Sequence, residues 1–97
     1  MNTEELKAII NDTGDSATVL LREHCPTVER RFKKMTNDLH KLLQEVREVF
    51  PDAVYYTSGG DCPSLVLGDP HSGNFQEPNT QLVALTATYL RVEGGDW

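Results

Sequence analysis

The side chains best suited to chemistry gather in one stretch of this chain, from Gly68 to Thr80. Within it Asp69, His71 and Ser72 lie almost side by side, and these are the residue types of a nucleophilic triad. Such a triad needs the base within hydrogen-bond reach of the nucleophile and a third group that orients the base. Adjacent loop residues do not reach that geometry without a scaffold, so we expect no catalytic residue and interpret the stretch as a surface loop.

Metal and nucleotide binding have no supporting motif. The possible metal ligands are three histidines and two cysteines: His24, His40, His71, Cys25 and Cys62. They lack the C-x2-C, H-x3-H and H-E-x-x-H spacings that place ligands on one face of an element. The Gly59-Gly60 pair is not followed by the lysine and helix that a phosphate-binding loop needs. We therefore expect no cofactor and no metal site.

A run of basic residues offers a binding surface. It comprises Arg30, Arg31, Lys33 and Lys34, with Arg22, Lys41 and Arg47 nearby. On a helical wheel the run lies opposite the apolar residues of the same segment, and a solvated outer face is its simplest interpretation. An acidic protein surface is the alternative partner. DNA reading by a helix-turn-helix is a further alternative, but the chain lacks a short recognition helix and a cluster of base-reading side chains.

Net charge separates the possible partners further. The chain carries −6 overall, with −3 over residues 1–21, +3 over 22–47 and −6 over 48–97. This acidity opposes general binding to DNA, because phosphate contacts supply most of that affinity. The acidic half admits a second hypothesis, in which spaced carboxylates imitate nucleic acid and inhibit a DNA-binding protein. Solubility is the simpler explanation of the same charge.

Two aromatic residues fall outside any periodic segment. Phe75 is surrounded by polar and turn-forming residues, and Trp97 follows two glycines and an aspartate. Large aromatics are enriched among the residues that dominate interfaces, so both are candidate anchors for a protein partner. With His71 and the basic run they complete the predicted partner-binding set. In the alternative, Phe75 folds back as a lid on a sheet and Trp97 pairs at its edge.

The stretch from Cys25 to Phe50 is the predicted element that would position these candidate residues. Apolar residues recur there at alternating steps of four and three: Val28, Phe32, Met35, Leu39, Leu42, Val46 and Val49. This spacing predicts one stripe along a long helix, widened by Leu43 and Phe50. The N-terminal helices, or the same helix of a second copy, would pack on it. A homodimer would use Phe32, Met35, Leu39, Leu42, Leu43 and Val46.

Two short helices are predicted before the long one. Asn2 has the position of an N-cap for a helix over residues 3–11, with a glutamate three residues later as its reciprocal acid. A second helix is capped by Asp15 or Ser16. It ends near Cys25, because the proline that follows disfavours helical geometry in the residue before it.

The second half of the chain predicts a small sheet. Residues 54–57 and 65–67 are strand-forming runs on either side of a glycine-rich turn, which is typical of a hairpin. Residues 81–92 are rich in Val, Leu, Thr and Tyr and predict a third strand. A helix is the alternative there, since apolar residues also fall at helical spacing.

These elements predict an α+β fold, with two short helices and one long amphipathic helix followed by a three-stranded antiparallel sheet that covers the apolar stripe. The chain of 97 residues, 38% of them apolar, suits a single domain with a helical half (1–52) and a β half (53–97). No apolar run reaches the roughly 18 residues of a membrane span, and the N-terminal residues do not have the pattern of a secretory signal. We expect no membrane partner and a cytoplasmic location.

No motif assigns the chain to a named family. A short acidic chain with N-terminal helices, a glycine-rich small sheet and the sequence Gly-Gly-Asp-Trp at 94–97 resembles the small accessory proteins encoded in the early regions of tailed phages and prophages. The resemblance implies a non-catalytic protein that acts on a host or phage partner, and it carries over no site residues. We predict a non-enzymatic protein-interaction module.

Overall fold

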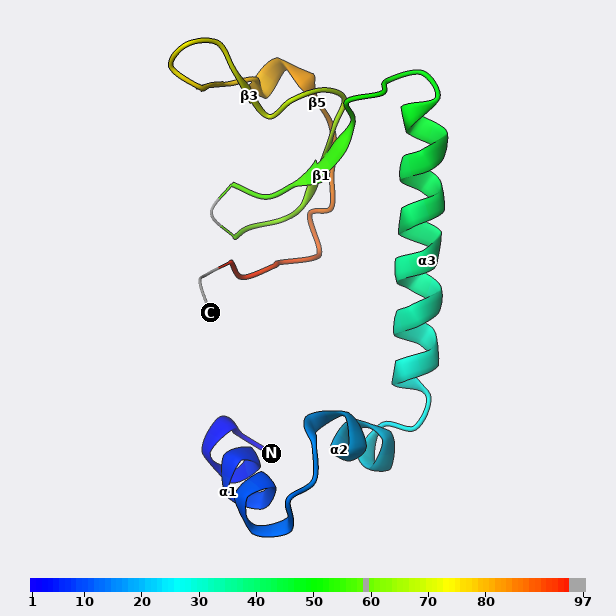
Figure 1. Cartoon of the computed structure of the whole chain (residues 1–97), viewed down its shortest axis with the longest axis vertical. Coiled ribbons are helices and arrows are strands. Elements are labelled where there is room, and N and C mark those ends of the chain that lie inside the picture. The colour runs from blue at the N-terminus through cyan, green and yellow to red at the C-terminus, as the bar shows by residue number, and fades with distance from the viewer. Residues whose placement is uncertain (59, 95–97) are drawn as a thin grey trace. The chain divides into compact units, whose positions relative to one another are not determined.

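The computed structural model describes residues 1–58 and 60–94 and contains three helices followed by a small antiparallel sheet (Figure 1). This is the α+β class that the sequence predicts. The chain forms two compact units, Met1–Leu39 and His40–Trp97, which divide within the long helix. We describe each unit by itself.

Capping residues set the bounds of the first helix, α1 (Thr3–Thr13). The side chain of Asn2 accepts a hydrogen bond from the backbone N–H of Glu5 at 2.9 Å, which confirms the predicted N-cap. The helix ends at Gly14, whose φ of 74° is a left-handed conformation that glycine adopts without steric cost. The observed helix therefore runs slightly beyond the predicted end.

The second helix, α2 (Ala17–His24), begins at Ser16, one of the two predicted caps. The Ser16 hydroxyl accepts a hydrogen bond from the backbone N–H of Val19 at 3.3 Å. The helix ends at Cys25, as the following proline predicts. Among the described residues of this unit Leu20 alone is buried, while apolar side chains of α1 are half-buried. The first unit thus has a small core.

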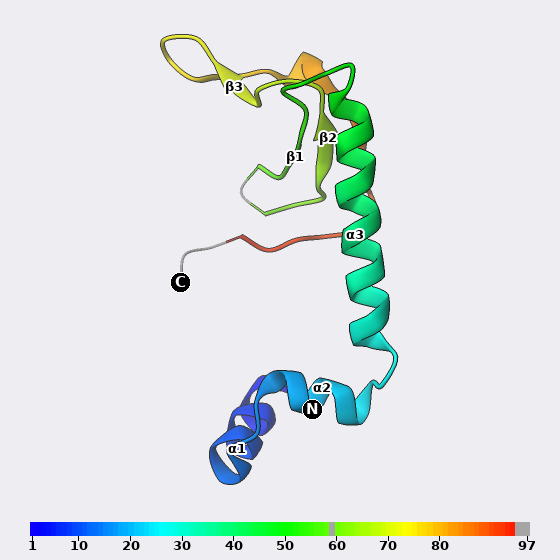
Figure 2. The ribbon, with the colours of Figure 1, turned by 45° about the vertical axis from the view of Figure 1, so that its right-hand side comes forward.

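The long helix, α3 (Val28–Arg47), is one continuous ribbon in Figure 2. It ends before the predicted stretch does, so Val49 and Phe50 follow the helix and do not extend its apolar stripe. At its end the Nε of Arg47 donates a hydrogen bond to the backbone oxygen of Ala53 at 2.8 Å. This bond ties the helix end to the segment that enters the sheet, and Ala53 is fully buried there. Among the described residues, no helix combines the length and apolar content that spanning a bilayer requires.

The main sheet is antiparallel with β2 in the centre. Its strands are β1 (Val54–Tyr56), β2 (Ser64–Val66) and β5 (Val83–Thr86). The paired rows are Val54–Val66–Val83, Tyr55–Leu65–Leu85 and Tyr56–Ser64–Thr86. Because side chains alternate across a sheet, the first and third rows share one face, and a shift of register between Leu65 and Val66 accommodates the extra residue of β5. Val66 is the buried centre of that face.

The predicted loop over residues 68–80 contains structure of its own. It holds a second sheet of two short strands, β3 (His71–Ser72) and β4 (Glu77–Pro78). A single turn of 3-10 helix, η1 (Thr80–Leu82), then leads into β5. Strands of two residues are too short to show any periodicity in the sequence, so the prediction of a plain loop missed this hairpin.

The third strand is shorter than the predicted 81–92, because only β5 pairs with β2. The backbone N–H of Ala87 donates to the oxygen of Pro63 at 2.9 Å. Proline has no N–H to extend the ladder, and the chain then turns with a hydrogen bond from Leu90 to Ala87 at 3.1 Å. The helical alternative for this segment is wrong as well.

The predicted burial of the apolar stripe by the sheet is not found within the second unit, where Leu42 is exposed and Leu43 and Val46 are half-buried. In the first unit Phe32, Met35 and Leu39 are exposed. Val49 and Phe50, which follow α3, are exposed as well. Strands of three or four residues offer too little apolar area to bury a stripe that runs along a helix of 20 residues.

Candidate functional site

The α3 stripe, which we define as Val28, Phe32, Met35, Leu39, Leu42 and Val46, is the first candidate surface. Within it Phe32, Met35 and Leu42 are 66%, 64% and 48% exposed. Their steps of three and seven place them along one face of the helix. Single exposed apolar residues are common on proteins, whereas a contiguous row of them marks an interaction surface.

Ion pairs occupy part of the predicted basic surface. Arg22, in the last turn of α2, donates from Nε and Nη2 to the two carboxylate oxygens of Glu29 at 2.6 and 3.0 Å. Lys33 pairs with the same carboxylate at 3.1 Å, and Lys34 pairs with Asp38 at 3.4 Å. These contacts reduce the positive field of the basic run and weaken the case for DNA binding by this face.

The contact between Arg22 and Glu29 joins α2 to α3 electrostatically. Hydrogen bonds from Arg22, and next from Lys33, lower the pKa of Glu29 to about 2. The same contact raises the pKa of Arg22 above its usual value. Glu29 lies in the first turn of α3, where the helix dipole also favours a carboxylate. We interpret this cluster as a structural link between two helices.

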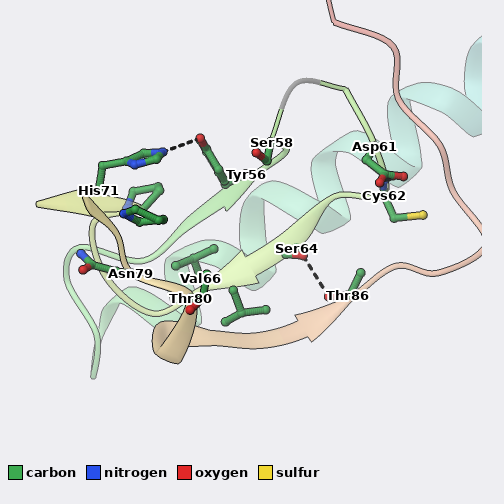
Figure 3. A pocket seen from close by; sticks show the side chains of 13 residues that line it. Tyr56, Ser58, Asp61, Cys62, Ser64, Val66, His71, Asn79, Thr80 and Thr86 are labelled. Carbon is green, nitrogen blue, oxygen red and sulfur yellow. Dashed lines mark hydrogen bonds between the residues drawn. The ribbon is translucent and has the colours of Figure 1, made fainter. Parts of the chain in front are cut away.

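A hollow of about 450 Å³ on one face of the main sheet is the second candidate site (Figure 3). Val66 lies among its lining residues, with hydroxyl groups from all three strands around it. The Ser64 Oγ and Thr86 Oγ1 atoms lie 2.9 Å apart and hydrogen-bond each other. Polar groups that satisfy one another are poorly placed to orient a ligand, which ligand pockets do with a few convergent polar groups.

The hydrogen-bond partners of His71 determine which of its ring nitrogens carries the proton. The Nδ1 atom lies 3.1 Å from the backbone oxygen of Gln76, and a carbonyl oxygen can only accept. The neutral ring therefore carries its proton on Nδ1 and accepts a hydrogen bond from the Tyr56 hydroxyl at Nε2, over 2.8 Å (Figure 3). The two rings also meet edge to face, with centroids 5.7 Å apart. His71 thus fastens β3 to β1.

The His71 and Ser72 side chains and the backbone of Asp69 take part in the hydrogen bonds of a hairpin. His71 uses both ring nitrogens in the contacts just described. The Ser72 hydroxyl donates to the Asn79 Oδ1 at 3.2 Å, and the Asn79 Nδ2 donates to the backbone oxygen of Asp69 at 2.8 Å. These hydrogen bonds close the base of the β3–β4 hairpin, and none of them pairs Ser72 with the imidazole.

Phe75 lies in the turn between β3 and β4 and is 87% exposed. Gly73 and Gln76 flank this turn with φ angles of 84° and 51°, and the backbone N–H of Gln76 donates to the oxygen of Gly73 at 3.2 Å. The alternative in which Phe75 covers the sheet as a lid is therefore wrong. Trp97, the other predicted anchor, lies outside the described residues.

Cys25 is exposed, Cys62 is half-buried, and both are free thiols. Within residues 1–58 and 60–94, no cluster of three or more His, Cys, Asp or Glu side chains is arranged to hold a metal ion. The Cys62 thiol lies 3.6 Å from the backbone oxygen of Thr88 and helps to hold the segment after β5.

The hollow and the Tyr56–His71 contact were not predicted from the sequence. The two residues are 15 positions apart and belong to different sheets. The sequence does show the alternation within β1, which sets Tyr56 on the face of the sheet opposite Tyr55. This alternation does not indicate which later segment packs against the face that carries Tyr56.

Comparisons with known proteins identify no relative. No family model matches the chain, and no curated protein or solved structure is significantly similar to it.

Proposed function

We propose that this protein is a non-enzymatic protein-interaction module whose binding surface is the α3 stripe. One observation carries the proposal: Phe32, Met35 and Leu42 are exposed along one face of a single helix. Removing such apolar area from water is the dominant driving force in most protein association. Amphipathic helices bind their partners through anchors at this spacing.

The remaining features support a role in binding over a role in catalysis. Within the hollow the Ser64 and Thr86 hydroxyls bond each other, and the His71 ring is engaged at both nitrogens. Phe75, exposed at the tip of a hairpin, would supply a second anchor. The resemblance to accessory proteins of tailed phages and prophages agrees with a protein that acts by binding a host or phage partner.

Substitutions on opposite faces of α3 test this proposal. Met35→Asp places a charge within the α3 stripe, and Asn37→Asp places the same charge on the outer face of the helix as a matched control. Both positions are exposed in the single chain, so we expect circular dichroism to show wild-type helicity for both variants. Burying an unpaired charge in an interface should weaken binding at least about tenfold for Met35→Asp alone.

The readout is quantitative mass spectrometry of co-purified proteins, combined with sedimentation of the purified chain. The first measures binding to other proteins and the second measures self-association. If Met35→Asp matches Asn37→Asp in both measurements, the α3 stripe is not the binding surface and the proposal fails.

A second candidate function is mimicry of nucleic acid by the acidic half. Residues 48–97 carry −6 with Arg91 as their one basic residue, and its guanidinium lies 3.9 Å from a carboxylate oxygen of Asp61. Affinity of a mimic for a DNA-binding protein should fall steeply between about 50 and 200 mM salt, because ions screen its charges. A partner bound through the α3 stripe should respond only weakly to the same change.

A further inference from the structure

We infer that the occupant of the α3 stripe is a second copy of this chain, whose α3 lies antiparallel to the first. The inference rests on the proposed function, since it names the partner of the same surface. The alternating steps of four and three along the stripe are the spacing of helices that pair side by side. The charged residues beside the stripe distinguish a second α3 from a helix of another protein. They also distinguish an antiparallel pair from a parallel one.

Charged residues flank one side of the α3 stripe, and the sign of their charge changes along the helix. In the heptad frame that places Phe32 at position a, the residues at position g are Arg31, Asp38 and Glu45. The base thus lies toward the N-terminal end of α3 and the acids toward its middle and C-terminal end. All three are exposed and can reach across to a neighbouring helix.

An antiparallel pair brings the g positions of its two helices together. The register with the greatest overlap sets Phe32 opposite Leu42 of the second copy, so that each a residue from Phe32 to Val46 meets a d residue. In this register Arg31 faces Glu45 of the second copy, and the symmetry of the dimer repeats the contact. Opposite charges at both ends of the interface therefore fit a second α3.

The centre of this interface sets Asp38 opposite its own symmetry copy. Like charges there would oppose association, but Lys34 already pairs with each Asp38 carboxylate at 3.4 Å. The lysine reduces the net repulsion at the centre. The charge pattern therefore stays favourable overall for the antiparallel arrangement.

A parallel pair gives no such match. Position g would then face position e of the other helix, so that Asp38 meets Leu43 and Arg31 meets Thr36, while Glu45 has no helical residue opposite because α3 ends at Arg47. Asp38 would lie against an apolar side chain without a base opposite. The antiparallel direction is the one that pairs Arg31 with a carboxylate.

A charge swap tests both the occupant and its direction. We expect the wild type to sediment as a dimer at about 100 micromolar, since an interface of cellular relevance is seldom weaker. Arg31→Glu and Glu45→Arg should each raise the dissociation constant about tenfold, because each turns two attractions into repulsions. The double variant, which restores opposite charges across the interface, should return to within about threefold of the wild type.

The rescue is specific to the antiparallel direction. In a parallel dimer residues 31 and 45 of the two chains are separated by about 21 Å along the helix axis, so the second substitution could not restore an affinity that the first had lowered. That outcome overturns the direction. Circular dichroism of every variant should show wild-type helicity, because the substituted side chains are exposed.

A monomeric wild type at about 100 micromolar overturns the inference outright. If Met35→Asp still abolishes binding of a different protein in that case, the proposed function survives and only the second copy is excluded. If Met35→Asp does not weaken binding of any protein, both the proposed function and the inference of a second copy fail. Met35→Asp should itself convert the dimer to a monomer, whereas Asn37→Asp should leave the dimer intact.

Discussion

His71 shows how a reactive side chain can serve the fold. Its ring bridges the Tyr56 hydroxyl of β1 and the backbone oxygen of Gln76, over 2.8 and 3.1 Å. Both contacts use ring nitrogens that a general base would need free for its substrate. At the scale of single residues, the His71 imidazole is therefore engaged in joining the two sheets.

Removing the Tyr56 hydroxyl should loosen this junction. Tyr56→Phe deletes the donor to His71 and should lower the free energy of unfolding by about 0.5–1 kcal/mol, as for one solvent-accessible hydrogen bond. Urea denaturation measures the change. Tyr89→Phe is the matched control, since Tyr89 is fully exposed and should lose nothing. Equal stabilities of the two variants would show that the contact does not hold the hairpin.

Phe75 should behave as a surface residue in the isolated protein. Phe75→Ala should leave the melting temperature within about two degrees, because an exposed aromatic contributes little burial. A buried phenylalanine would lose about 3–5 kcal/mol on the same substitution. Differential scanning calorimetry distinguishes these cases. If Phe75 is a partner anchor, the variant should also bind its partner more weakly at unchanged stability.

At the scale of elements, the junction between α2 and α3 depends on the Glu29 carboxylate. Its pKa of about 2 in the folded chain lies below the usual 4.5, so the ionised form stabilises the fold. This contribution is complete above about pH 4.5 and is lost as the pH falls toward 2. Because the carboxylate binds Arg22 and Lys33, its protonation releases both contacts.

A pH series of unfolding measurements checks this linkage. The wild type should be more stable than Glu29→Gln at pH 6, and the difference should shrink between pH 4.5 and 2. Glu48→Gln removes a carboxylate outside this contact and serves as the control. A difference between wild type and Glu29→Gln that stays constant over this range would contradict the assigned role.

The caps of the two N-terminal helices were predictable because their determinants are local. Asn2, Gly14 and Ser16 each act within a few residues of their own position, through a side-chain cap or a backbone conformation. The β3–β4 hairpin and the early end of β5 depend on contacts between distant segments, such as the bond from Ala87 to Pro63. Strand propensity along residues 81–92 could not reveal where the partner strand ends.

The same limit applies to the candidate surface. Periodicity predicted the α3 stripe correctly, but the sequence gives no measure of the apolar area that a sheet of short strands can cover. The exposure of Phe32 and Met35 became apparent only in the structure. The hollow beside Val66 was missed for a related reason, because its walls come from segments distant in the sequence.

At the scale of the whole molecule, the described core is small. Leu20 is the buried hydrophobic residue of the first unit, and Ala53 and Val66 are those of the second, within the part of the chain that the structure describes. Small domains with little core gain stability from association. A second copy on the α3 stripe would bury apolar residues that the single chain leaves in water, which links the proposed interface to the stability of the fold.

Methyl NMR of the methionines tests this central claim most directly. The chain has two methionines, Met35 within the α3 stripe and Met1 outside it, and they are 64% and 63% exposed. With methyl-labelled methionine, the Met35 signal should shift or broaden as the concentration rises from about 10 micromolar to 1 millimolar, while the Met1 signal stays constant. A Met35 signal that does not change over this range, in a chain that also sediments as a monomer, would contradict an interface between copies at the α3 stripe.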